Sequence, residues 1–340
     1  MKLRVENLHK SFGDKHVLKG LSFEAQAGQA FALLGRNGAG KTTTIRIIMD
    51  VFKADQGQLF WNDQPLSQAH IRVAYLPEER GLYEKEPILR QVIYIAELRG
   101  MPYQEAKSQA LKWLDRFGMA DHAKDKLETL SKGNQQKIQL AVALLNEPDL
   151  IIFDEPFSGL DPVNAQLLKD VILEQVDLGK VVFFSSHQMS YVENICQDMA
   201  LLYEGKIRLQ GSIREIRRQA DRSKLALELC QDGRFLSPEE AQAVIQTAQA
   251  QGQIQAGIKA LSLGKENLLV QLTGPDQAKQ LFRDLAACPY RVDKFQVVEP
   301  TLEEIFIHYT GGQALDVAEG DTSGPQPDQP SPSAGRQSEA

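Results

Sequence analysis

The sequence predicts an α/β chain in which a parallel core sheet is joined by an N-terminal antiparallel β-subdomain, a helical insert and a small α+β C-terminal domain. Two apolar runs, 150–153 and 181–184, are continuous rather than alternating, as in strands buried on both faces of a parallel sheet. A helical pattern at 162–175 separates them and gives a βαβ unit. A third apolar run, 29–34, leads through a glycine-rich turn into a helix at 41–50. These runs place a parallel sheet at the centre of the fold.

Composition and charge narrow the class of protein. The chain has 340 residues, of which 42% are hydrophobic and 24% charged, enough for a sizeable core in two domains with a tail. The formal net charge is −7, and residues 311–340 carry −4 of it, with five acidic residues against Arg336. The rest of the chain is therefore close to neutral, which disfavours a general nucleic-acid binder.

The cysteines and the apolar runs indicate the compartment. Cys196, Cys230 and Cys288 are too widely spaced for a disulfide framework or a CxxC metal site, as expected in a reducing compartment. The N-terminus lacks the apolar core of a secretory signal, and no apolar run approaches the ~18 residues of a membrane helix. We therefore expect a cytoplasmic chain that reaches a membrane only through a partner.

The elements of the first domain follow in chain order. The first thirty residues alternate polar and apolar side chains and predict short antiparallel strands. From 87 to 118 the apolar period becomes helical, so a helical subdomain is expected over about 80–140. A hairpin at 200–209 then closes a first domain that spans 1–211.

A second, smaller domain is predicted after a linker at 212–222. Its pattern over 223–310 reads strand, helix, strand, helix, strand, followed by a last helix over Leu302–Tyr309. Residues 311–340 contain no aromatic side chain and four prolines among serine, glutamine and glycine. That composition predicts a disordered tail.

A phosphate-binding loop is predicted between the apolar run 29–34 and the helix after it. The segment that matches G-x-x-x-x-G-K-[ST], with the threonine that follows it, reads Gly35, Arg36, Asn37, Gly38, Ala39, Gly40, Lys41, Thr42, Thr43. Glycines let backbone N–H groups converge on phosphates, and the helix N-terminus adds its positive dipole end. Lys41 would reach the β- and γ-phosphates and Thr42 would ligate Mg²⁺. A chance glycine-rich turn is the alternative, but the flanking strand and helix favour a nucleotide site.

Two carboxylates, Asp154 and Glu155, end the buried strand 150–153. The carboxyl edge of a doubly wound sheet also holds the phosphate loop, so these side chains are expected beside the nucleotide. Asp154 is placed to hold Mg²⁺, and Glu155 to orient an attacking water as a general base. An acidic pair after a strand can also cap a helix. The phosphate loop upstream favours the catalytic interpretation.

Together with the phosphate loop and the acidic strand, five further segments form a set in the order of one family. They are Phe12 in Lys10-Ser11-Phe12-Gly13, Tyr75-Leu76-Pro77-Glu78, Leu130-Ser131-Lys132-Gly133-Asn134-Gln135-Gln136-Lys137, Ser158-Gly159-Leu160-Asp161, and Ser186-His187. These resemble the adenine-stacking aromatic, the Q-loop, the signature, the D-loop and the switch histidine of ABC ATPases. Over residues 1 to about 210, the chain resembles the ATP-binding subunit of an ABC transporter, a P-loop NTPase.

The resemblance implies a role for each matched residue, and each has a structural alternative. Phe12 would stack on adenine, or lie in the core. His187 would contact the γ-phosphate and hold Glu155 and the water, or simply end a strand. Ser131 would cap the nucleotide of a second copy together with Lys132, Gly133 and Asn134, or serve as a helix N-cap.

Two departures from the family pattern are present. Lys132-Gly133-Asn134 stands where the commonest form has Gly-Gly-Gln, and Glu78 stands where the family usually has Gln. Glu78 can ligate Mg²⁺ as the Gln oxygen does, or instead face solvent or pair with Arg80. The stretch around Glu78 and the ending Pro300-Thr301-Leu302-Glu303-Glu304-Ile305-Phe306 resemble bacterial exporter ATPases of the sodium-efflux and drug-efflux type.

The resemblance also implies cofactors and partners. We expect ATP and Mg²⁺, a second ATP-binding subunit (a homodimer closing head to tail), and a separate integral-membrane permease that holds the chain on the inner face of the cell membrane. The helical insert and the Glu78 loop would face that permease. One alternative is a soluble ABC ATPase acting on nucleic acid or ribosomes, which the acidic balance disfavours. Another is a regulatory subunit without turnover, against which Glu155 and His187 argue.

Overall fold

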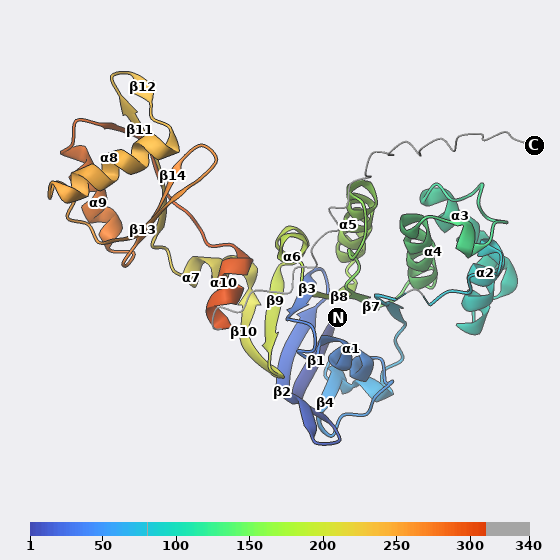
Figure 1. Cartoon of the computed structure of the whole chain (residues 1–340). Helices are drawn as coiled ribbons and strands as arrows, with labels where there is room; N and C mark the ends of the chain where they lie inside the picture. Colours follow the sequence, from blue (N-terminus) through green and yellow to red (C-terminus); the bar gives the residue numbers. More distant parts are fainter. Residues whose placement is uncertain (80, 311–340) are drawn as a thin grey trace, which may run out of the picture.

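The computed structural model describes residues 1–79 and 81–310, which form three β-sheets with helices around them (Figure 1). The tail predicted for 311–340 lies outside the described residues. Within the described part of the chain, no helix combines the length and the apolar character needed to cross a bilayer.

The N-terminal sheet is antiparallel, with the strand order β2-β1-β4-β5. Its strands are β1 (Lys2–Phe12), β2 (Lys15–Gln26), β4 (Gln56–Trp61) and β5 (Gln64–Pro65). Leu3, Val5 and Leu8 of β1 are buried while their neighbours are less so, because one face of this sheet packs on the core. A turn through Gly13, whose φ is 57°, joins β1 to β2 and leaves Phe12 at the tip of the sheet.

The central sheet has the order β10-β9-β3-β8-β7-β6, and every neighbouring pair except β10–β9 is parallel. Its strands are β3 (Ala30–Leu34), β6 (Val73–Leu76), β7 (Leu150–Asp154), β8 (Val181–Ser186), β9 (Asp198–Tyr203) and β10 (Lys206–Ser212). Every residue of β3, β7 and β8 is buried, as the continuous apolar runs predict. The carboxyl ends of β3, β6, β7 and β8 lie at one edge, which brings the predicted site residues together.

Helices cover this sheet and build a separate insert. Those beside the sheet are α1 (Lys41–Ile48), α5 (Pro162–Asp177) and α6 (Met189–Ile195), whereas the short η1 (Leu66–Gln68) packs on β4 of the N-terminal sheet. Those of the insert are α2 (Ile88–Leu98), α3 (Tyr103–Arg116), η2 (Leu127–Thr129) and α4 (Lys132–Leu144). Figure 1 shows α2, α3 and α4 grouped on one side of the molecule, away from α1. The predicted helical subdomain of about 80–140 contains this group.

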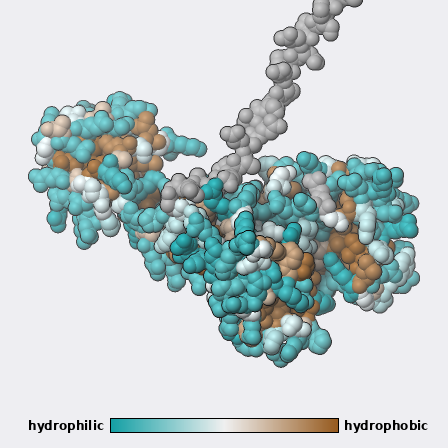
Figure 2. All heavy atoms as spheres, turned by 60° about the horizontal axis from the view of Figure 1, so that its bottom comes forward, coloured by the Kyte–Doolittle hydropathy of each residue, from teal (hydrophilic) through white to brown (hydrophobic). Residues whose placement is uncertain are grey.

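The C-terminal sheet has its own hydrophobic core, built from one face of the sheet and two helices. Its elements are β11 (Lys224–Gln231), β12 (Arg234–Phe235), α8 (Pro238–Ala250), β13 (Ile258–Leu263), β14 (Leu268–Leu272), α9 (Gln277–Ala286) and β15 (Arg291–Val297). The space-filling view shows this part as a lobe beside the larger body, at the left as in Figure 1 (Figure 2).

Two helices connect this lobe to the larger core. The predicted linker 212–222 contains α7 (Ile213–Gln219), whose Ile213 and Ile216 are buried in the core of the central sheet. The last described helix, α10 (Leu302–Tyr309), buries Leu302, Ile305 and Phe306 in that same core and packs on α6. Both ends of the C-terminal lobe therefore return to one place on the larger body.

The carboxylate of Glu193 in α6 contacts both α7 and the start of α10. Glu193 accepts a hydrogen bond from the Leu302 N–H at 2.7 Å, and Arg217 of α7 lies 4.0 Å from the same carboxylate oxygen. The Arg217 guanidinium also donates to the Pro300 carbonyl at 3.1 Å. Glu193 thus joins α6, α7 and α10.

Candidate nucleotide site

The predicted phosphate loop connects β3 to α1, and close backbone approaches explain two of its glycines. A Cβ at Gly35 would lie 2.6 Å from the Leu202 carbonyl oxygen of β9. Gly40 has a φ of 116° and a Cβ there would lie 2.6 Å from a methyl group of Leu18. Any side chain at either position would therefore push the loop off the sheet edge.

Lys41 begins α1 and its ammonium is held inside the loop. The side chain is only 6% exposed. Its Nζ donates to the Gly35 carbonyl at 2.8 Å and lies 3.5 Å from the Arg36 carbonyl and 3.2 Å from Oε1 of Glu155. A buried cation on the loop backbone is placed to meet phosphate oxygens.

Asp154 ends β7 and is anchored by two hydroxyl groups. The buried carboxylate accepts hydrogen bonds from the Ser185 hydroxyl and, at 3.3 Å, from the Tyr75 hydroxyl. Burial and the nearby negative charge of Asp154 raise the pKa of Tyr75 to about 12. No motif assigned a role to Tyr75 or Ser185, although Tyr75 lies in the segment that resembles the Q-loop.

Glu155 lies between a cation and a histidine. Its Oε2 is 2.9 Å from Nδ1 of His187 and accepts from the His187 N–H at 3.2 Å, while Oε1 faces Lys41. The φ of Glu155 is 48°, a left-handed conformation that side chains other than glycine rarely adopt. This turn aims the carboxylate back across the sheet edge, and such backbone strain is typical of functional sites.

Glu78 follows β6 and adds a third carboxylate to this edge. Partial burial, and then the negative charges of Glu155 and Asp154, hold the pKa of Glu78 above its usual range. Carboxylate and hydroxyl oxygens are the ligands that Mg²⁺ takes beside phosphates. Glu78 and Thr42 line the same pocket, and their oxygens are of the kind that could hold a magnesium ion there.

Lys41, Glu78 and Glu155 border one pocket of about 300 Å³, whose lining does not include Asp154 or His187. Its lining comprises Phe12, Lys15, Val17, Arg36, Asn37, Gly38, Gly40, Lys41, Thr42, Thr43, Glu78 and Glu155. Phe12 is 44% exposed, so it does not lie in the core. The structure thus brings the predicted stacking residue, phosphate loop, Glu78 and predicted base into one cavity.

The predicted signature and D-loop lie outside this pocket. Ser131 is the N-cap of α4, and its hydroxyl accepts from the Asn134 N–H at 3.4 Å; Lys132 is exposed. Gly133 is buried against the Asn164 side chain, which leaves no room for a Cβ. The D-loop segment Ser158–Asp161 is mostly exposed, and Asp161 caps α5 by accepting from the N–H groups of Val163 and Asn164 at 3.0 Å each.

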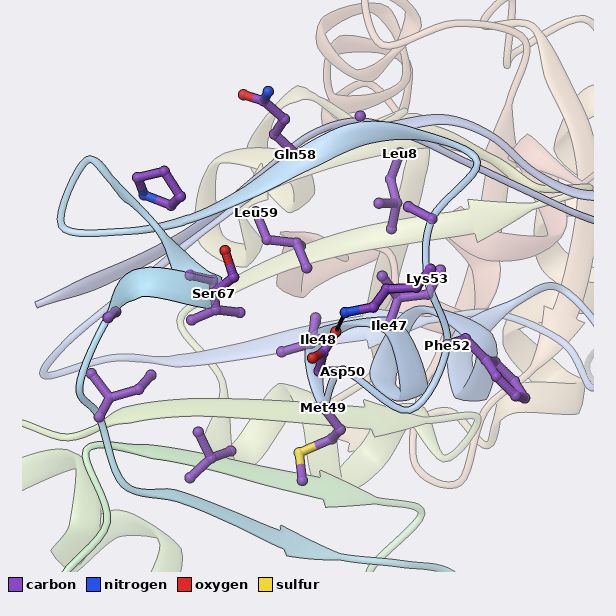
Figure 3. Close-up of a pocket in the computed structure, with 17 residues that line it drawn as sticks. Leu8, Ile47, Ile48, Met49, Asp50, Phe52, Lys53, Gln58, Leu59 and Ser67 are labelled. Carbon is purple, nitrogen blue, oxygen red and sulfur yellow. Dashed lines mark hydrogen bonds and ion pairs between the residues drawn. The ribbon is translucent and has the colours of Figure 1, made fainter.

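A larger cavity of about 550 Å³ lies beyond the C-terminal end of α1 (Figure 3). Ile47, Ile48 and Leu59 line it, and none of the predicted site residues does. Phe52 lies at one end of this cavity. Its ring is edge-on to the ring of Phe12, which lines the nucleotide pocket, and the two ring centroids are 5.4 Å apart.

Comparisons with known proteins give two matching family models. Residues 18–158 match a model described as ABC transporter. Residues 211–310 match a model described as the C-terminal domain of ATP-binding proteins like DrrA1-3. The first match contains the phosphate loop, Asp154 and Glu155, and the second contains the C-terminal lobe together with α10.

Relatives and a solved structure extend these matches. The chain is 38% identical over 311 residues to the uncharacterized ABC transporter ATP-binding protein YhaQ of Bacillus subtilis, covering 91% of this chain and 98% of that protein. It is 32% identical over 210 residues to the Nod factor export ATP-binding protein I of Burkholderia lata, covering 61% of this chain and 69% of that protein. A solved ATP-binding subunit of an ABC transporter superimposes with a TM-score of 0.60 at 30% identity, covering 64% of this chain and 93% of that one.

Proposed function

Because the chain belongs to the ABC transporter ATP-binding proteins, and is accordingly an ATPase subunit of a transporter, we propose that the pocket between Phe12 and Glu155 is where it binds and hydrolyses MgATP. The observation that carries this proposal is the position of Glu155, 3.2 Å from Lys41 and 2.9 Å from His187. A base beside a phosphate-binding cation is what phosphoryl transfer to water requires.

We assign the residues to parts of the reaction. Phe12 stacks on the adenine, the loop Gly35–Thr43 holds the phosphates, and Lys41 turns its ammonium from Glu155 and the loop carbonyls to the β- and γ-phosphates. Glu155 then accepts a proton from the water that attacks the γ-phosphorus, while the bond from that phosphorus to the bridging oxygen breaks and ADP leaves; His187 fixes the orientation of the carboxylate. Thr42, Asp154 and Glu78 would hold Mg²⁺ beside the phosphates, where it would supply neutralising charge.

A second copy of the chain completes the site in this proposal. Ser131, Gly133 and Asn134 lie outside the pocket of their own chain, at the start of α4, where Ser131 is exposed and Gly133 is buried. A head-to-tail homodimer places them, with Lys132, over the nucleotide of the partner, where the positive charge of Lys132 faces the γ-phosphate. The D-loops Ser158–Asp161 then lie near the dimer axis.

The helical insert is the surface we propose for the membrane permease. A groove of about 560 Å³ on the insert is lined by Leu89, Ile93, Tyr94 and Tyr103, with Lys107 among the charged residues at its border. Figure 2 shows hydrophobic atoms gathered on this side of the molecule. The Glu78 loop leads directly into α2 of the same insert, so the groove and the nucleotide pocket share one segment of chain.

Export is the direction we propose, with the chain on the cytoplasmic face of the membrane. A relative named for Nod factor export supports it. Membership of the transporter family leaves no support for the alternative of a nucleic-acid or ribosome ATPase. We therefore expect an integral membrane protein to co-purify with the full chain, and recovery of ribosomes alone would contradict the transport role.

The hydrolysis proposal is tested with two variants. Lys41→Ala should abolish ATP binding, because the phosphates lose their cation. Glu155→Gln should bind ATP normally and lose about 10²–10⁴-fold in turnover, the contribution of a general base. Lys53→Ala, an exposed lysine just beyond α1, is the matched control and should behave as the wild type. Unchanged turnover in Glu155→Gln would assign the base to another residue.

A further inference from the structure

The ring of Phe12 is exposed at the tip of a two-stranded turn, yet several contacts hold it in place. Asp55 directly precedes β4, the strand that pairs with β1, and it contacts the end of β1. Its carboxylate accepts from the Ser11 N–H at 2.6 Å and from Nζ of Lys10 at 2.9 Å. Its own N–H donates to the His9 carbonyl at 2.9 Å. Three bonds from Asp55 therefore fix the three residues that precede Phe12.

Two side chains then contact the ring of Phe12. Nζ of Lys10, held by Asp55, lies over the ring, 5.4 Å from its centroid. Phe52 meets the ring at an interplanar angle of 70°. A cation over one face of an aromatic ring is favourable and occupies that face. The same ring lines the nucleotide pocket, where a stacking partner would meet it.

We propose that Asp55 is a positioning residue for the adenine base: its carboxylate fixes the Ser11 backbone and draws Lys10 over Phe12, so that one face of the ring is presented to ATP. This inference rests on the proposed function of Phe12. Asp55 does not touch the nucleotide and acts only through residues 10–12.

The charge state of Asp55 suits this role. The hydrogen bonds from Lys10 and Ser11 hold the pKa of the Asp55 carboxyl below its usual range, so the group is ionised throughout the neutral range. Asp55 is exposed, although Lys10 is partly buried, and an ion pair with one solvent-exposed partner adds little to the stability of the fold. Loss of Asp55 should therefore change nucleotide affinity without changing the folded state.

The experiment compares the affinities of Asp55 variants for MgATP and for magnesium tripolyphosphate, which carries the phosphates without the base. We expect Asp55→Ala to weaken MgATP binding by about 5–10-fold, at the lower end of the range that base stacking supplies, and to leave tripolyphosphate binding unchanged. Asp55→Asn still accepts from the Ser11 N–H but loses the charge that holds Lys10, so its affinity for MgATP should be intermediate.

The controls separate this inference from the proposed function. Asp63→Ala removes an acidic side chain that pairs with Lys2 and Arg4 at the other end of the same strands, and should change neither affinity. Phe12→Ala tests the stacking itself and should weaken MgATP binding at least as much as Asp55→Ala. If Phe12→Ala weakens it and Asp55→Ala does not, the inference about Asp55 is wrong and the stacking stands. Equal losses for MgATP and tripolyphosphate in Asp55→Ala would also overturn it, and no loss in Phe12→Ala would remove the stacking role.

Discussion

Nδ1 of His187 lies 2.9 Å from Oε2 of Glu155, and the backbone N–H of His187 donates to the same oxygen at 3.2 Å. One residue thus holds the carboxylate at two points. His187 follows β8 and Glu155 follows β7, so the pair bridges adjacent parallel strands at their carboxyl ends. The sheet register therefore fixes the direction in which the predicted base points.

We expect His187→Ala to keep ATP affinity and to lose turnover by about 10²-fold or more, because Glu155 loses the ring that orients it. Steady-state hydrolysis and equilibrium nucleotide binding separate the two effects. His122→Ala, which removes an exposed histidine paired with Asp125, is the control and should leave both unchanged. A parallel loss of affinity and turnover would mean that His187 supports the pocket rather than the base.

Glu155→Gln should hold ATP without hydrolysing it and should therefore accumulate as a closed dimer. Light scattering in excess MgATP should show a doubled mass, and adding Ser131→Ala to this variant should reduce the dimer fraction, since Ser131 would contact the partner's nucleotide. A doubled mass that persists without ATP would show that closure does not depend on the nucleotide.

The raised pKa of Glu78 predicts a pH-dependent stability change. The folded chain holds this proton more tightly than the unfolded chain, so ionisation of Glu78 costs stability once the pH rises above the unfolded pKa. In the absence of nucleotide, Glu78→Gln should therefore raise the melting temperature at pH 7 and leave it unchanged near pH 4. Glu79→Gln is the control, and equal melting curves for both variants at pH 7 would refute the prediction.

If Glu78 ligates the metal, Glu78→Gln should remain active with a weaker apparent Mg²⁺ affinity, because a carboxylate is a stronger ligand than an amide oxygen. Glu78→Ala should lose most turnover. Titrations of ATPase activity with Mg²⁺ measure both effects. Identical titrations for the wild type and both variants would remove Glu78 from the metal site.

Phe306 of α10 is 1% exposed in the core of the larger body. We expect Phe306→Ala to lower the free energy of unfolding by about 3–5 kcal/mol, as for other buried aromatic side chains. Tyr309→Ala on the same helix removes a ring that is 45% exposed and should cost far less. Urea unfolding followed by circular dichroism compares the two.

Strands buried on both faces were predictable, because burial there leaves a continuous apolar run, as in β7 and β8. The edge strand β13 was missed, since most of its side chains are exposed and its sequence carries no clean alternation. Helix α7 was also missed, because two buried isoleucines among arginines give a weak period. Its two isoleucines are buried in a core that also contains residues of α10, which follows only after the whole C-terminal sheet.

Within the site, spacing alone predicted the phosphate loop and the acidic pair, and their roles stay predictions. Local motifs are enough to predict them, because one loop supplies the phosphate-binding groups and the end of one strand supplies both carboxylates. The contacts of Asp154 with Tyr75 and Ser185, and of Asp55 with Ser11, join strands whose neighbours in the sheet are set by tertiary packing. No local pattern encodes such pairs.

The return of α10 to the larger core sets the order in which this protein can mature on a ribosome. Leu302, Ile305 and Phe306 are synthesised only after the whole C-terminal sheet, yet they fill space beneath α6, which begins two residues after His187. A nascent chain that ends before α10 leaves apolar side chains of α6 and α7 open to water. The ATPase core is therefore completed last, so a translation product interrupted within the C-terminal lobe carries every residue that we propose to bind the nucleotide but an unfinished core.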